Sequence, residues 1–362
     1  MNLHVENPYT QLTLDALCAA KRAQASDIHF QPEEAGIDIR FRIHGSLIRW
    51  KLVPATHRIS LLQEVKRLCN LKLSVSLRPQ DARQSFPQFG LDVRANIVPT
   101  LHGEKVVLRL LERGRVFDLS NSGLSGGALH SLRGALGHRS GVCLITGPTG
   151  SGKTTTLYSA LRELDAADLN IVTIEDPIEY SFPGITQTQV GERMSFAEAL
   201  KAMLRQDPDV IIFGEIRDPE SAELCFQAAS TGHLVLSTLH ANGAREAVGR
   251  LRDLGISEDR LLSTLRFSSA QRLLAKLCPR CKSAVSVNDV HEGCEGAFKR
   301  NPRGCDDCHQ GLIGRIPILE TLEIRKEWEH PFNPPGFRPL SALASELART
   351  GEVDAFEALE VA

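Results

Sequence analysis

The spacing of hydrophobic positions predicts a small α+β domain at the start of the chain. Apolar residues alternate with polar ones at 27–30 and 37–43, and a His44-Gly45 pair separates them from a further apolar stretch at 47–50. Alternation with a period of two on both sides of a glycine turn is typical of a β-hairpin. Helical spacing and further apolar runs add helices at 10–24 and 59–71 and strands at 91–98 and 105–111.

The pattern changes after residues 113–125, a glycine-containing segment with few large apolar residues that we interpret as a linker or hinge. Short apolar runs then alternate with helical patterns, which favours a parallel sheet flanked by helices. Ser195 and Glu198 form the sequence signature of a capping box and mark the start of one helix. The strand-like runs lie at 142–146, 171–175, 210–213 and 234–237.

The composition and charge of the chain exclude several classes of protein. The chain has 362 residues, 42 of them basic and 44 acidic, and a formal charge of -2. This composition excludes a disordered chain and one that binds nucleic acid mainly through positive charge. No apolar run approaches the roughly 20 residues that span a bilayer, and the N-terminus lacks the features of a signal peptide. We therefore expect a cytoplasmic protein whose nine cysteines are core thiols or metal ligands.

Residues 147–154 form a complete phosphate-binding loop between a predicted strand and a predicted helix at 155–164. Glycines let successive backbone amides point at one anion, and the helix N-terminus adds its positive dipole. Lys153 supplies a charge to the β and γ phosphates, and the Thr154 hydroxyl can bind Mg²⁺. The expected nucleotide-binding residues are Gly147, Pro148, Thr149, Gly150, Ser151, Gly152, Lys153, Thr154 and Thr155.

Acidic residues follow two of the predicted strands. Glu215 comes after the strand at 210–213, and in a P-loop fold such a strand ends beside the nucleotide. An acid at this position can hold Mg²⁺ through water or polarise the attacking water. A second acidic cluster, 175–179, follows the strand that begins at 171. Two acidic strand ends at one edge of a sheet are what a metal–triphosphate site needs.

Two histidines, His233 and His240, bracket the strand that begins at Leu234. A neutral imidazole at such a position can respond to a bound phosphate or form a bridge to a neighbouring domain. A histidine on an apolar strand can equally be a structural residue whose hydrogen bonds are satisfied. The sequence leaves both interpretations open.

Four cysteines form two Cys-x-x-Cys pairs, one at 278–281 and one at 305–308, with 23 residues between them. Each pair can form one knuckle, and two knuckles together offer four thiolates to a tetrahedral Zn²⁺. A redox dithiol would account for one pair but not for two. We therefore predict a structural zinc site with the ligands Cys278, Cys281, Cys305 and Cys308. Other possible ligands nearby are His291, Cys294 and His309, and buried, inert thiols are expected at Cys18, Cys69, Cys143 and Cys225.

The sequence resembles the secretion ATPase superfamily of type II secretion, type IV pilus assembly and competence pseudopilus systems. The phosphate-binding loop matches the family's Walker A motif. The segment 175–179 matches its aspartate box, 204–218 its Walker B region and 231–242 its histidine box, in the same order and spacing. The amino-terminal segments 26–43, 78–83, 92–94 and 103–109 are similar to the family's PAS-like domain.

This resemblance, which covers most of the chain, implies an α/β fold in which a RecA-like P-loop ATPase domain follows a small α+β PAS-like domain. The expected parts are a PAS-like domain at 1–112, a linker or hinge at 113–125, a RecA-like ATPase core at 126–277, a tetracysteine zinc module at 278–320 and a helical C-terminal region at 321–362.

The resemblance also implies residue roles. Glu215 is similar to the general base that activates water, and Glu175 to the acidic-box residue near the metal. His233 and His240 are similar to the histidines that link the nucleotide to the adjoining domain. Lys153 and Thr154 correspond to the phosphate and magnesium contacts. Candidates for arginines that reach phosphate are Arg40, Arg42, Arg83, Arg94, Arg109 and Arg217.

The function implied is that of a homo-hexameric, Mg²⁺-dependent ATP hydrolase at the cytoplasmic face of the inner membrane. It would act on a membrane platform protein, without direct nucleic-acid contact, to assemble a pilus or pseudopilus for type II secretion, type IV pilus extension or competence. Two departures are expected to matter. Because residue 1 lies close to Ser26, we expect the further docking domain of many members to be missing, and His44 stands where the family usually has Asp.

The short chain with a zinc module is most similar to a competence-type or minimal assembly ATPase, because the family's retraction motors lack the four cysteines. Three alternatives remain open, namely a pilus retraction motor, a nucleic-acid translocase and a regulatory subunit that only binds nucleotide. The net charge of -2 disfavours the translocase.

Overall fold

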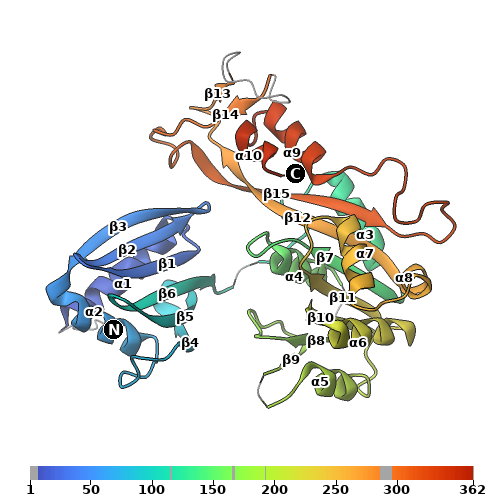
Figure 1. Cartoon of the computed structure of the whole chain (residues 1–362), viewed down its shortest axis with the longest axis horizontal. Coiled ribbons are helices and arrows are strands. Elements are labelled where there is room, and N and C mark those ends of the chain that lie inside the picture. The colour runs from blue at the N-terminus through green and yellow to red at the C-terminus, as the bar shows by residue number, and fades with distance from the viewer. Residues whose placement is uncertain (1–6, 115, 165–167, 192, 286–295, 362) are drawn as a thin grey trace. The chain divides into compact units, whose positions relative to one another are not determined.

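The computed structural model describes residues 7–361 except 115, 165–167, 192 and 286–295. The chain divides into two compact units, Met1–Val116 and Phe117–Ala362, and each is described by itself (Figure 1). Among the described residues, no helix combines the length and apolar character needed to cross a bilayer.

The first unit is an antiparallel sheet with two helices. In chain order its elements are α1 (Pro8–Arg22), β1 (Asp27–Glu33), β2 (Gly36–Ile43), β3 (Ser46–Pro54), the 3-10 helix η1 (Ala55–His57), α2 (Arg58–Leu68), β4 (Gln80–Phe86), the 3-10 helix η2 (Pro87–Phe89), β5 (Leu91–Thr100) and β6 (Gly103–Glu112). The strand order is β3-β2-β1-β6-β5-β4, and every neighbouring pair is antiparallel. The predicted hairpin is confirmed as β2 and β3, with the His44-Gly45 pair in its turn.

Alternation along these strands separates a buried face from a polar face. Ile28 and Phe30 of β1 are fully buried and pack in one core with Leu17 of α1 and Val65 of α2. The intervening positions of β1 and its neighbours carry charged side chains, among them Asp27, and form the opposite face. The two helices therefore cover one side of the sheet, and arginines gather on the other.

The second unit contains a seven-stranded sheet. Its strands are β7 (Gly141–Thr146), β8 (Ile171–Glu175), β9 (Thr186–Gln189), β10 (Val210–Ile216), β11 (Leu234–Leu239), β12 (Leu265–Leu277) and β15 (Leu312–Glu323). Their order is β15-β12-β7-β11-β10-β8-β9, and all neighbours are parallel except β12 and β15. The predicted parallel sheet is thus confirmed, with one antiparallel strand added at its edge (Figure 1).

Helices cover both faces of this sheet. They are α3 (Gly126–Leu136), α4 (Lys153–Glu163), α5 (Phe196–Met203), α6 (Pro219–Ser230), α7 (Ala244–Asp253), α8 (Glu258–Thr264), α9 (Leu340–Arg349) and α10 (Ala355–Leu359). Successive residues of β7 point to opposite faces. Leu144 joins a core with α5, α6 and α7, whereas Ile145 joins a second core with α3 and α4. The capping box of Ser195 and Glu198 is confirmed at the start of α5.

Strands β9, β12 and β15 were not predicted from the hydrophobic pattern. In β12, Ser268 and Ser269 are fully buried, and their hydroxyls donate to the carbonyl oxygens of Ala244 and Leu144 at 2.8 and 2.9 Å. Backbone acceptors in neighbouring elements thus satisfy the hydrogen bonds of these polar side chains inside the sheet. Because buried serines are tolerated there, the sequence of β12 lacks the continuous apolar pattern of the other strands. A short ribbon of β13 (Ser283–Ala284) and β14 (Phe298–Lys299) lies between β12 and β15 in sequence.

The second unit begins with an aromatic anchor that can be tested. Phe117 is buried, and its ring centroid lies 5.4, 4.9 and 5.6 Å from those of Tyr158, Tyr180 and Phe182. Phe117→Ala should lower the free energy of unfolding of this unit by about 3–5 kcal/mol, because it leaves a cavity in the core. Phe117→Leu should cost less, since it keeps most of the apolar volume.

The measurement is urea unfolding followed by the fluorescence of Trp328. A Trp50→Phe background removes the tryptophan of the first unit, so that the signal reports the second unit alone. A loss below about 1 kcal/mol for Phe117→Ala would contradict the buried placement of this ring.

Candidate functional site

The phosphate-binding loop connects strand β7 to helix α4. Its backbone has φ angles of 143° at Gly147, 80° at Gly150 and 90° at Gly152, which side chains rarely allow. A Cβ atom on Gly147 would lie 2.5 Å from the carbonyl oxygen of Gln271, and one on Gly152 would lie 2.7 Å from Gln271 Nε2. Glycine is therefore required at 147 and 152 because the loop is packed closely against β12.

The side chain of Lys153 lies along this loop. Its Nζ donates to the carbonyl oxygens of Gly147 and Pro148 at 2.7 and 2.9 Å. Burial lowers the pKa of Lys153, and the negative charge of Glu215 opposes that shift. Thr154 and Thr155 are half-buried in the first turn of α4. Loop amides, an ammonium and two hydroxyls are a set of groups that suits a polyphosphate and its metal ion.

Glu215 lies near the carboxyl end of β10, with its side chain 18% exposed. Arg217 Nε donates to Glu215 Oε2 at 2.7 Å, and this hydrogen bond raises the pKa of Arg217. His240 Nε2 lies 2.7 Å from Glu215 Oε1. Arg217 also approaches Asp176, with 3.5 Å between Nη1 and Oδ2. The acid predicted to act as the base is thus flanked by an arginine and a histidine.

The parallel register explains why these residues meet. Leu239 is opposite both Thr146 of β7 and Ile216 of β10, while Phe213 is opposite Ile174 of β8. The strands that carry the phosphate-binding loop, the acidic box, Glu215 and His240 consequently end at the same edge of the sheet.

Glu175 occupies a different environment from Glu215. It is buried, and its Oε1 accepts hydrogen bonds from Thr173 Oγ1 at 2.6 Å and Gln187 Nε2 at 3.1 Å. Its Oε2 accepts a hydrogen bond from the hydroxyl of Tyr158 on α4. Burial, followed by the charge of Glu175, raises the pKa of Tyr158. The structure therefore places Glu175 beneath the site as a tie between α4 and β9, and Asp176 is the more exposed acid of this box.

His233 lies away from the other predicted catalytic residues. It precedes β11, whereas His240 follows it, so the two are separated by the length of the strand, about 20 Å for six residues. Its Nδ1 lies 2.9 Å from the carbonyl oxygen of Ala228 and 3.1 Å from Thr231 Oγ1. Within its own unit, His233 is at the edge of the sheet opposite the phosphate-binding loop.

The predicted arginines of the first unit form a row across the polar face of its sheet. Asp27 is opposite Arg42 on one side and Arg109 on the other, and Arg94 is the next partner of Arg109. The arginine Nε atoms of Arg42 and Arg109 lie 3.9 and 3.2 Å from the Asp27 carboxylate. Arg40 lies on the same face, with its Nε 3.6 Å from Asp38. A partly exposed row of guanidinium groups is suited to bind an anion.

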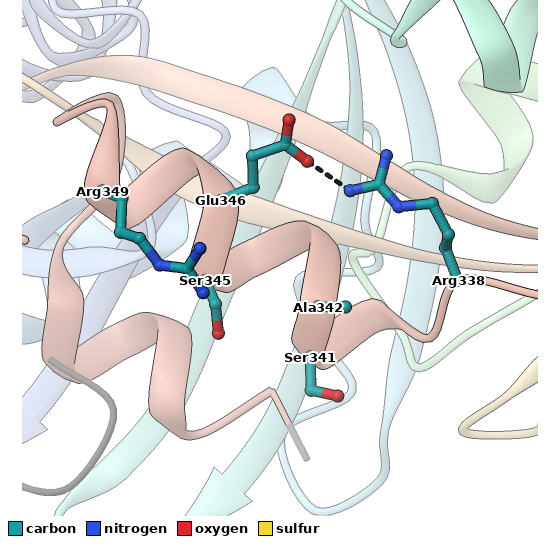
Figure 2. A pocket seen from close by; sticks show the side chains of 6 residues that line it. All are labelled: Arg338, Ser341, Ala342, Ser345, Glu346 and Arg349. Carbon is teal, nitrogen blue, oxygen red and sulfur yellow. Dashed lines mark hydrogen bonds and ion pairs between the residues drawn. The ribbon is translucent and has the colours of Figure 1, made fainter.

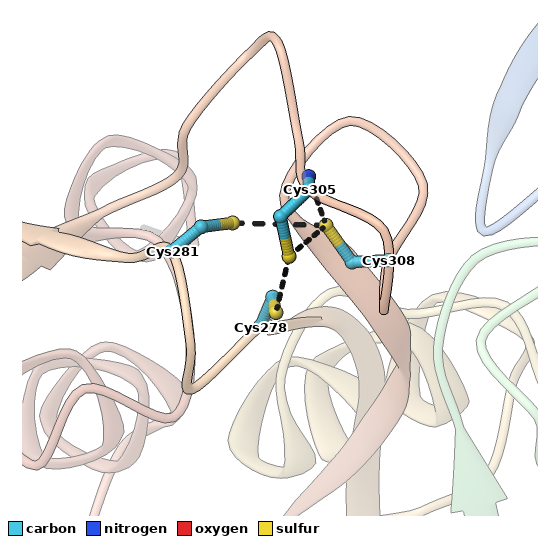
Figure 3. Close-up of side chains that lie close together, drawn as sticks. All are labelled: Cys278, Cys281, Cys305 and Cys308. Carbon is cyan, nitrogen blue, oxygen red and sulfur yellow. Dashed lines mark hydrogen bonds between the residues drawn. The ribbon is translucent and has the colours of Figure 1, made fainter.

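The four predicted zinc ligands converge (Figure 3). Cys278 Sγ lies 3.7 Å from Cys305 Sγ, and Cys281 Sγ lies 3.6 Å from Cys308 Sγ. A tetrahedral Zn²⁺ with Zn–S bonds of about 2.3 Å needs sulfur atoms about 3.8 Å apart, so the donor set fits zinc. Among the described residues, only these four form such a cluster. The possible ligands His291 and Cys294 lie outside the described residues.

Three of the four other thiols predicted to be buried are buried, and Cys18 is not fully so. Burial raises the pKa of Cys69, Cys143 and Cys225 to about 12 each, so these thiols are protonated at neutral pH. Cys18 is half-buried on α1.

A hollow on α9 lies apart from this chemistry (Figure 2). It is lined by Arg338, Ser341, Ala342, Ser345, Glu346 and Arg349. Arg338 and Glu346 pair with each other across it, and it contains none of the predicted site residues.

The hydrophobic pattern gave no sign of three residues that support the site. Tyr158, Gln271 and Arg272 belong to no phosphate-binding or acidic motif. Thr156 Oγ1 donates to Gln271 Oε1 at 2.8 Å, which ties α4 to β12. Gln271 and Arg272 stand in a segment, 265–277, where polar and apolar residues mix without a clear period, so the sequence offers no signal for them.

Comparison with known proteins identifies the family to which the sequence is similar. Residues 3–335 match the family described as "Type II/IV secretion system protein". The chain is 44% identical over 328 residues to type II secretion system protein E of Klebsiella pneumoniae, and 41% identical over 331 residues to the type IV pilus assembly ATPase PilB of Myxococcus xanthus. These alignments cover 88% and 87% of this chain but 66% and 58% of those proteins, so the chain spans less than two thirds of their length.

Solved structures show the same fold. The X-ray structure of the Legionella pneumophila ATPase DotB has a TM-score of 0.71 at 22% identity, covering 100% of this chain and 98% of that one. The crystal structure of the pilus retraction motor PilT with bound ADP has a TM-score of 0.68 at 26% identity, covering 99% and 97%. The fold and the site define a P-loop protein of the secretion ATPase type. The chain belongs to the family of type II/IV secretion system proteins.

The cysteine cluster leads to a prediction about metal content. Elemental analysis of the purified chain should find about one Zn²⁺ per molecule, because four converging thiolates form a closed tetrahedral site. Cys305→Ser should lose most of the zinc and have a lower unfolding temperature. Cys18→Ser should keep the wild-type zinc content and unfolding temperature. Equal zinc contents in these two variants would contradict the assignment.

Proposed function

We propose that the protein is a Mg²⁺-dependent ATP hydrolase that works as a hexameric motor for pilus or pseudopilus assembly. The observation that carries the proposal is the position of Glu215 at the same sheet edge as the phosphate-binding loop, in contact with Arg217 and His240. The systems considered are type II secretion, type IV pilus extension and competence DNA uptake. The motor would act in the cytoplasm, at the inner membrane, through a platform protein.

In this proposal the loop amides and Lys153 bind the β and γ phosphates. Glu215 accepts a proton from the attacking water, Arg217 holds its Oε2 through a hydrogen bond, and His240 lies beside its Oε1. The Thr154 hydroxyl is the residue suited to hold Mg²⁺, which would neutralise phosphate charge when bound. Glu175 contributes indirectly, since it fixes α4 through Tyr158.

The alternatives differ in what supports them. The pilus retraction motor PilT shares the fold of this chain, so retraction remains a second candidate. The cysteine cluster favours assembly over retraction, by the family resemblance. A nucleic-acid translocase would need a cationic path, for which the net charge of -2 offers little support. A regulatory subunit would bind ATP without turnover.

Steady-state assays test the proposal. Wild-type protein should hydrolyse ATP only with Mg²⁺, and Glu215→Gln should lower kcat by at least about 100-fold, because general-base catalysis contributes roughly that much. Lys153→Ala should lose both turnover and nucleotide binding. Glu220→Gln, which removes an exposed acid on α6, is the matched control and should stay near wild type. Normal turnover in both site variants would reject the proposal.

Subunit mixing tests the arginines. Arg94→Ala and Arg109→Ala should each lower kcat by at least about 100-fold if their guanidinium groups stabilise the transferring phosphate. We propose that they act on the nucleotide of a neighbouring subunit. An inactive Arg109→Ala protein mixed with inactive Lys153→Ala protein should then regain part of the activity, because some active sites combine an intact arginine with an intact loop. A mixture as inactive as its components would contradict action between subunits.

A further inference from the structure

Strand β12 extends beyond the end of β7 and runs beside the phosphate-binding loop. Ala270 is opposite Thr146, the last residue of β7, so Gln271 and Arg272 continue along the loop itself. The loop rests on Gln271, whose backbone oxygen and side chain exclude any Cβ at Gly147 and Gly152. Arg272 is the next residue, and it is half-buried.

Arg272 joins two backbone segments of the site. Its Nη1 donates to the carbonyl oxygen of Gln271 at 3.1 Å, and its Nη2 donates to the carbonyl oxygen of Asn242 at 3.0 Å. Asn242 lies two residues after His240, whose Nε2 is 2.7 Å from Glu215 Oε1. One guanidinium group thus ties the strand beside the phosphate-binding loop to the segment that carries His240.

The charge of Arg272 also reaches the loop. It lowers the pKa of Lys153, in the same direction as burial and against the effect of Glu215. Burial lowers the pKa of Arg272 itself, while Glu320 and Glu246 oppose that shift. Both acids stand at the start of α7, since Glu320 accepts a hydrogen bond from the Ala244 amide at 2.7 Å and Glu246 belongs to its first turn. Arg272 is therefore a cation between these acids and the loop lysine.

We propose that Arg272 is a positioning residue for ATP hydrolysis, which fixes the backbone after His240 against Glu215 and adds a second positive charge beside the phosphate-binding loop. This inference rests on the proposed function. A guanidinium group can serve both purposes because it stays charged while it donates several hydrogen bonds in one fixed plane. An ammonium would keep the charge without the planar pair of bonds, and a neutral amide would keep a donor without the charge.

These two substitutions separate the roles. Arg272→Lys should lower kcat about tenfold, the usual effect of losing one charged hydrogen bond, with the KM for Mg-ATP and the Kd for ADP within about twofold of wild type. Arg272→Gln should lower kcat by at least the same factor and also weaken ADP binding about fivefold to tenfold. Lys276→Gln removes an exposed charge from the same strand and should leave all three constants unchanged.

The split between the three constants gives a readout that a merely structural role would not move. Arg272→Lys keeps the positive charge, so kcat should fall while the KM for Mg-ATP and the Kd for ADP stay near their wild-type values. Damage to the fold would instead change all three constants in both variants.

Wild-type kcat in both Arg272 variants would overturn the inference. So would equal losses in kcat, ADP affinity and unfolding temperature in both variants, since these would indicate a structural role alone. Failure of the proposed function is distinguishable, because the wild-type protein itself would then show no Mg²⁺-dependent turnover. ADP binding by the two Arg272 variants would still test the position of Arg272 in that case.

Discussion

The register of four parallel strands is the constraint on which the site depends. β7, β8, β10 and β11 end together because alternate residues of each strand enter different hydrophobic cores. A slip of one residue would exchange the two faces, mismatch the side chains of the two cores and move each loop away from its neighbours. The same packing free energy that fixes the fold therefore also brings an ammonium, a carboxylate and an imidazole together at one edge.

Local motifs made much of the site predictable. The glycine loop, the Glu215 strand and the cysteine pairs each carry their chemistry within a few residues. The structure places the loop after β7 and Glu215 near the end of β10, as the pattern predicts, and it brings the four thiols together. Interactions between distant segments could not be foreseen. Glu175 is buried because Tyr158 and Gln187 reach it from other elements, and the polar interior of β12 is satisfied by acceptors in β7 and α7. The position of His233 ahead of β11 does follow from the strand direction.

On the polar face of the first unit, aspartates pair with the arginines that are candidates for binding phosphate. Asp27 stands between two of them, and the other arginines of the row have aspartate partners at 3.4 Å or more. The pair of Arg94 with Asp81 is exposed at both ends, and such pairs contribute between 0 and about 1 kcal/mol, so Arg94 can exchange its carboxylate for a phosphate at small cost. The carboxylates of Asp27 and Asp38 are buried, so the arginines paired with them are held more firmly. The aspartates orient the row and limit repulsion between its members.

The cysteine cluster has a consequence for how the chain can vary in evolution. Cys278 directly follows β12, and Cys308 precedes β15, so the thiols stand at the open end of an antiparallel pair. A metal cross-link there would fix the two strand ends whatever the length of the segment between Cys281 and Cys305. The entropy of closing a loop grows only slowly with its length. The segment between Cys281 and Cys305 can therefore gain or lose residues with little effect on the pairing of β12 and β15. The segment is thus a place where related chains can diversify while the strand that supports the glycine loop stays unchanged.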